Sequence, residues 1–110
     1  MEDYKIDQIV QKVYELSKLK KLNWSIPKKA SSDYFVTNVS NNEIAIFNTG
    51  IRYVIEIYDR RGNLLDSKTE DAFSGSNMFY SLKELYEIAK SDALKIEENL
   101  NNLLDDLNSL

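Results

Sequence analysis

The longest periodic pattern of apolar residues in this chain lies between Ser81 and Asn108. Its steps alternate between three and four residues, which is the heptad repeat of a helix that packs along one stripe. We therefore predict one long helix over Ser81–Asn108, about 40 Å in length at 1.5 Å per residue. Ser81 and Glu84 match the capping box that begins many helices. The repeating apolar positions are Tyr86, Ala89, Ala93, Ile96, Leu100, Leu103 and Leu107.

A second amphipathic pattern predicts a helix from Tyr4 to Lys20. Apolar side chains fall on one stripe of this helix, and charged or amide side chains occupy most other positions. Four of the apolar residues repeat the spacing of the C-terminal pattern, so the two helices are expected to pack together. The stripe consists of Ile6, Ile9, Val10, Val13 and Leu16.

Four short segments between the two helices have the composition and the alternation of β-strands. The alternation is clearest in Ile51–Tyr58, where Ile51, Tyr53 and Ile55 share one face. Polar turns connect each segment to the next, and consecutive strands joined in this way form an antiparallel meander. The predicted strands are Tyr34–Val39, Glu43–Phe47, Ile51–Tyr58 and Leu64–Thr69.

The order of these elements predicts an α+β fold in a single domain, residues 1–110. An N-terminal helix precedes an antiparallel four-strand meander, and the long C-terminal helix packs on one sheet face (α-β-β-β-β-α). A chain of 110 residues is long enough to bury one core.

Composition removes several classes of function. The chain has no His and no Cys, so imidazole bases, thiolate nucleophiles and His or Cys metal ligands are absent. We expect no enzyme, no cofactor and no metal site. No apolar run approaches the ~20 residues that span a bilayer, and the acidic N-terminus does not match a signal peptide. The cytoplasm is the expected location, and no membrane partner is expected.

The net charge of −4 is unevenly distributed along the chain. Residues 1–30 carry seven Lys against four acids, whereas residues 64–110 carry four Lys against ten acids. Such a division suggests that the basic and acidic segments lie beside each other, within one chain or across a dimer. Nucleic-acid modules are more often basic overall, so nucleic acid is not the expected partner.

The segment from Lys18 to Lys29 combines basic and apolar residues and contains no acid. One interpretation is an anion or nucleic-acid contact, in which the Trp24 ring stacks on a base while lysines neutralise phosphate. The other, which we favour, is that Trp24 fills the core and the lysines are solvated. The candidate contact residues are Lys18, Lys20, Lys21, Trp24, Lys28 and Lys29.

The favoured functional hypothesis is a small non-enzymatic protein-interaction module. A helix of about 40 Å is twice the length of a typical strand, so a sheet leaves its far end uncovered. We expect self-association there, giving a homodimer. Competing structures are a first helix that covers the stripe, or a break near residues 99–102. The candidate interface residues are Ile96, Leu100, Leu103, Leu104 and Leu107.

Two alternatives stay open. The first is a phage- or mobile-element-type regulator or inhibitor that binds a basic protein partner through the acidic C-terminal region. The second is weak nucleic-acid binding through the Lys18–Lys29 segment. The acids of the first alternative are Glu84, Glu87, Asp92, Glu97, Glu98, Asp105 and Asp106.

Overall fold

The computed structural model describes residues 3–27, 34–71 and 82–110 of the chain. Within these ranges the helices are α1 (Asp3–Lys18), α2 (Leu82–Leu94) and α3 (Ile96–Asn108). The strands are β1 (Tyr34–Val39), β2 (Asn42–Asn48), β3 (Arg52–Tyr58) and β4 (Leu64–Asp71). The predicted cap at Ser81 lies outside the described residues.

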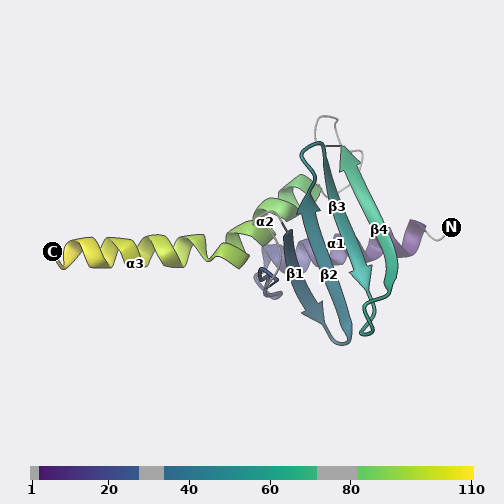
Figure 1. Ribbon diagram of the computed structural model, residues 1–110, viewed down its shortest axis with the longest axis horizontal. Coiled ribbons are helices and arrows are strands. Elements are labelled where there is room, and N and C mark those ends of the chain that lie inside the picture. The colour runs from purple at the N-terminus through teal and green to yellow at the C-terminus, as the bar shows by residue number, and fades with distance from the viewer. Residues whose placement is uncertain (1–2, 28–33, 72–81) are drawn as a thin grey trace.

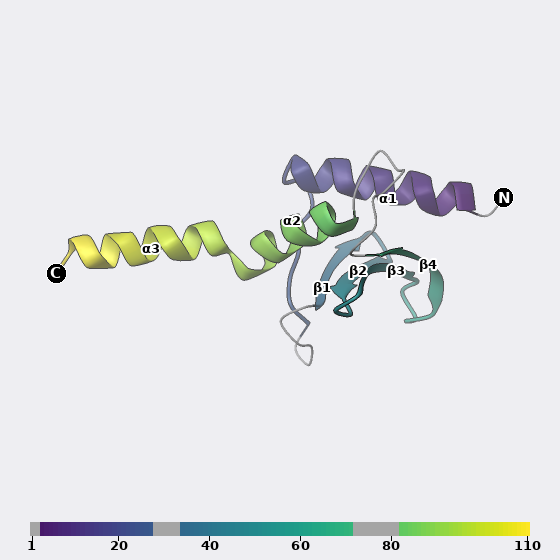
Figure 2. The ribbon, with the colours of Figure 1, turned by 90° about the horizontal axis from the view of Figure 1, so that it is seen from above.

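The four strands form one antiparallel sheet in the order β1-β2-β3-β4, so the predicted meander is confirmed. Helix α2 contacts all four strands, and α1 contacts α2 and β4. Both helices lie over the same face of the sheet (Figures 1 and 2). The protein therefore has the predicted α+β fold.

The core lies between the sheet and these two helices. Alternation along β3 turns Tyr53 and Ile55 toward the helices, and both are buried. Helix α2 contributes Leu85 and Tyr86 from the facing layer. The ring centroid of Tyr86 lies 5.5 Å from that of Phe35 and 5.3 Å from that of Tyr53. Since each such side chain stabilises the fold by about 1.5–3 kcal/mol when buried, this layer anchors α2 to the sheet.

Helix α1 ends at Lys18, two residues before the predicted end. Lys20 has a φ of 60°, in the left-handed region. The amide of Lys21 donates to the carbonyl of Leu16 at 2.9 Å, and the amide of Lys20 donates to that of Ser17 at 3.1 Å. This is the hydrogen-bond pattern of a Schellman motif, which terminates the helix and turns the chain toward β1.

The prediction of one uninterrupted C-terminal helix is wrong. Lys95 adopts φ 51° and ψ 47°, in the left-handed region, and separates α2 from α3. The predicted packing on the sheet holds for α2, while α3 contacts α2 alone among the described elements. Figures 1 and 2 show α3 extending away from the sheet and α1. The competing prediction placed a break near residues 99–102, and the observed break lies earlier in the chain.

The projection of α3 gives the molecule an elongated shape. Its principal-axis extents are 59 × 34 × 25 Å, and its radius of gyration is 15.4 Å. A compact domain of this length has a radius of gyration of about 13 Å. The larger radius of gyration follows from α3, which extends away from the rest of the domain.

Candidate functional site

The exposed apolar side of α3 is the first candidate site. The five predicted interface residues lie on one side of this helix, and each is between 40% and 61% exposed. Leu110 follows the end of α3 and is 99% exposed. We call the apolar side of α3 the leucine face; it consists of Ile96, Leu100, Leu103, Leu104 and Leu107.

Local hydrogen bonds support α3 as a separate helix. The Asn99 side chain donates from Nδ2 to the carbonyl of Leu94 at 2.9 Å, and its amide donates to the carbonyl of Lys95 at 2.9 Å. At the other end, Ser109 donates from its amide and from Oγ to the carbonyl of Asp105. These bonds satisfy carbonyl groups that the helix ends leave free.

The remaining surface of α3 is polar and carries acids without cations. Glu98, Asp105 and Asp106 are exposed, and the sequence from 96 to 110 contains no Lys or Arg. Of these acids, Asp106 lies beside the leucine face, whereas Glu98 and Asp105 lie on the opposite side of α3. The predicted acidic region is not one continuous surface, because Glu84, Glu87, Asp92 and Glu98 line a separate groove.

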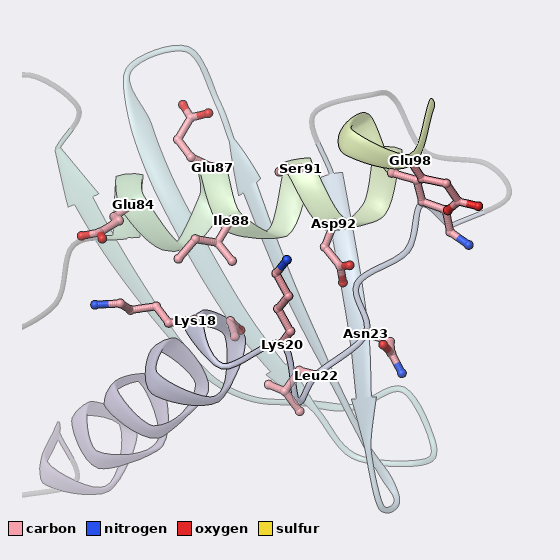
Figure 3. Close-up of a pocket in the computed structure, with 12 residues that line it drawn as sticks. Lys18, Lys20, Leu22, Asn23, Glu84, Glu87, Ile88, Ser91, Asp92 and Glu98 are labelled. Atoms are coloured by element: carbon pink, nitrogen blue, oxygen red, sulfur yellow. The ribbon is translucent and has the colours of Figure 1, made fainter. Parts of the chain in front are cut away.

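This groove has a volume of about 730 Å³ and runs between α2 and the segment that follows α1 (Figure 3). Leu22 and Ile88 form its apolar part. Three cations and four carboxylates are mixed around it, so the groove has no strong preference for either sign of charge. The charged lining consists of Lys18, Lys20, Lys95, Glu84, Glu87, Asp92 and Glu98.

Trp24 lies in the core, in agreement with the favoured interpretation of its segment. Its side chain is 4% exposed, and its indole Nε1 donates to Ser17 Oγ at 3.0 Å. The Trp24 amide donates to Asp92 Oδ2 at 2.7 Å, which ties this segment to α2. The ring is consequently not available for stacking on a base. The role of Asp92 had no signal in the sequence, since the two residues are 68 positions apart.

The other candidate anion contacts do not form one basic site. Lys18 and Lys20 reach the groove, where carboxylates of α2 face them (Figure 3). Lys18 also lies over the Tyr14 ring, with Nζ 5.1 Å from the centroid. Lys21 is exposed. Lys28 and Lys29 lie outside the described residues.

Metal binding and membrane insertion gain no support from the described ranges. There, no three His, Cys, Asp or Glu side chains gather into a possible metal site. No helix in residues 3–27, 34–71 and 82–110 combines the length and the apolar character needed to cross a membrane.

Comparison of this chain with protein-family models, with curated proteins and with solved structures found no match. We therefore infer function from the geometry of the chain itself.

Proposed function

We propose that the protein is a non-enzymatic protein-interaction module that forms a homodimer through the leucine face. One observation supports this above all: a row of large apolar side chains on a helix that, among the described elements, contacts α2 alone. Removing such a surface from water is favourable, and rows of this kind mark interaction sites. We further propose a cytoplasmic location, which a chain without cysteine favours.

The expected dimer is weak. Each interface side chain of α3 has about half its surface left to bury, which contributes about 1 kcal/mol. The total gain in two copies is of the same order as the association cost of about 4–15 kcal/mol. We therefore expect dimers only at high protein concentrations, of about 0.1 mM and above.

Salt is expected to strengthen this dimer. Two copies of α3 bring together segments that carry Glu98, Asp105 and Asp106 and no Lys or Arg from residue 96 to 110, and Asp106 lies nearest the leucine face. Salt screens the repulsion between these carboxylates, while burial of leucine is not weakened. Binding of a basic partner to the same acids has the opposite salt dependence.

The test is the solution mass from light scattering on a sizing column, between about 0.01 and 1 mM protein, a range that spans the expected onset of dimerisation. The wild-type mass should rise with concentration and with salt. Leu100→Asp should remain monomeric, because it places a charge in the centre of the leucine face. Asn102→Asp adds the same charge on the polar side of α3 and should dimerise nearly as wild type. Circular dichroism checks that each variant is folded.

A monomeric wild-type protein at about 1 mM, or equal association of wild type and a folded Leu100→Asp variant, would contradict the proposal.

A second candidate function is a phage- or mobile-element-type regulator that binds a basic protein through the acids of α3. The lack of any Lys or Arg from residue 96 to 110 favours it. It predicts binding that salt weakens and that neutralising Asp105 and Asp106 removes. We do not propose nucleic-acid binding through residues 18–29, because Trp24 is buried.

A further inference from the structure

The sheet has a second face, which no described helix or strand covers (Figures 1 and 2). Side chains alternate along each strand, so the neighbours of the core residues point away from the helices. The register places Tyr34 opposite Phe47, and Phe47 opposite Val54. We call the central part of this surface the open face. It consists of Tyr34, Val36, Glu43, Ala45, Phe47, Val54, Glu56 and Tyr58.

The open face is an ordered aromatic platform. The rings of Tyr34 and Phe47 stack with centroids 5.3 Å apart and planes inclined by 20°. Both side chains are half-buried, and the next open-face residues along the same strands, Val36 and Ala45, are almost inaccessible to water. A partner that binds here therefore meets side chains already held in position, which lowers the entropy lost on binding.

Two carboxylates lie on the same platform. Glu43 is opposite Tyr58 on the next strand, and Glu56 is two residues before Tyr58 on the same side. Tyr58 donates from Oη to Glu56 Oε1 at 2.6 Å. This hydrogen bond and burial raise the pKa of Tyr58. Burial, followed by the charges of Glu56 and Glu43, raises the pKa of Tyr34.

The described cations near these carboxylates form no ion pair with them. Neither Glu43 nor Glu56 forms an ion pair with any described residue. Arg52 is on the same side of β3 but four residues from Glu56, or about 13 Å. Arg60 borders a hollow of about 470 Å³ that Glu43 also lines. Both carboxylates are half-buried, and an external cation placed beside them would be attracted by both.

We propose that the open face binds a basic segment of a partner protein, with one Arg or Lys side chain at Glu43 and Glu56 and a second against the ring pair of Tyr34 and Phe47. A guanidinium or ammonium group is attracted by carboxylates and by aromatic rings alike. Phosphate groups of a nucleic acid are repelled by the same carboxylates. A second copy of this chain carries the same acids and a net charge of −4, so it is disfavoured on this face.

The test uses the full chain and a fluorescein-labelled nonapeptide of alternating Arg and Ser, with fluorescence anisotropy at low salt. Replacing both Glu43→Gln and Glu56→Gln should weaken binding at least about tenfold. The amide introduced at position 56 can still accept the Tyr58 hydrogen bond. The urea midpoint of this variant should therefore stay close to that of wild type.

The matched control replaces Glu15→Gln and Glu87→Gln, two exposed acids on helices away from the open face. It changes the net charge equally and should weaken binding by less than about twofold. An equal loss of peptide affinity in both variants would show that only the net charge matters, and it would overturn the proposal. Absence of peptide binding to wild type would overturn it as well.

Amide chemical shifts locate the bound peptide independently of affinity. Shifts centred on Tyr34, Glu43 and Glu56 are expected, whereas shifts centred on α3 would overturn the assignment. Leu100→Asp should leave peptide binding unchanged, because the leucine face and the open face lie on different elements. The proposal of a homodimer and the proposal of a basic partner can therefore be refuted independently of each other.

Discussion

Single residues connect the N-terminal segment to the rest of the domain. Trp24 fills a space between the end of α1 and α2, and it uses both of its N–H groups. The indole donates to Ser17, and the backbone amide donates to the carboxylate of Asp92. Buried polar groups are stable only when they are paired, so these bonds determine the position of the ring. The lysines around Trp24 take no part in them.

Trp24→Phe should lower the free energy of unfolding by about 2–3 kcal/mol. The change leaves a small cavity and removes the indole N–H, which donates a hydrogen bond to the buried Ser17 Oγ. Urea unfolding measures the effect, with Lys21→Ala as an exposed control expected to change stability by less than about 0.5 kcal/mol. Salt-sensitive quenching of wild-type Trp24 fluorescence by single-stranded DNA would contradict the buried position.

At the scale of elements, the break between α2 and α3 at Lys95 determines that the leucines of α3 form a surface separate from the core. Lys95 adopts the left-handed conformation, which is unfavourable by about 1–2 kcal/mol for a residue with a Cβ. No side chain caps the first turn of α3 from this position, although Asn99 satisfies the carbonyl of Leu94. The apolar rows of α2 and α3 are therefore separate surfaces, one in the core and one in solvent.

The sign of the stability change in Lys95→Gly tests this break. Glycine adopts the left-handed conformation without strain, which stabilises the folded chain. This gain is expected to equal or exceed the entropy cost of ordering the more flexible glycine. We expect the urea midpoint to stay equal or to rise, corresponding to about 0–1 kcal/mol. Lys90→Gly, inside α2, should instead cost about 1 kcal/mol. A comparable loss in both variants would indicate a helix that continues through residue 95.

At the scale of the whole molecule, the folded body and α3 are energetically separate. Among the described residues, the buried apolar side chains belong to α1, to Trp24, to the sheet and to α2, and the last of them is Ala89. Helix α3 adds length to the molecule and almost no buried surface. Stability and association are consequently expected to reside in different parts of the chain.

A chain that ends at Lys95 should retain cooperative unfolding, with a free energy within about 1 kcal/mol of the full chain. It should also be monomeric at every concentration, since it lacks the leucine face. Urea unfolding and light scattering measure the two properties on the same samples. A chain that ends at Tyr86 is the control, and it should fail to fold because Ala89 and the end of α2 are lost. A loss of more than about 3 kcal/mol in the first truncation would contradict the separation.

Much of this architecture was predictable from local patterns. The two-residue period of Ile51–Tyr58, the polar turns and the three-four spacing of α1 depend on neighbours along the chain, so the helix, the strands and their antiparallel order follow from them. The exposure of Leu100, Leu103 and Leu107 was predictable as well. Helix and strand lengths alone indicate that a sheet cannot cover the end of so long a periodic segment.

Other features depend on contacts that no local pattern records. The residues around Lys95 include neither Gly nor Pro, so no local signal marks the break after α2. The break separates α2, which contacts the strands, from α3, which contacts α2 alone among the described elements. The place of Trp24 depends on Asp92, which is distant in sequence. Likewise, the open face requires the register that brings Tyr34 to Phe47 and Glu43 to Tyr58. Periodicity specifies which side a residue faces within its own element, whereas partners across elements exist only after the chain has folded.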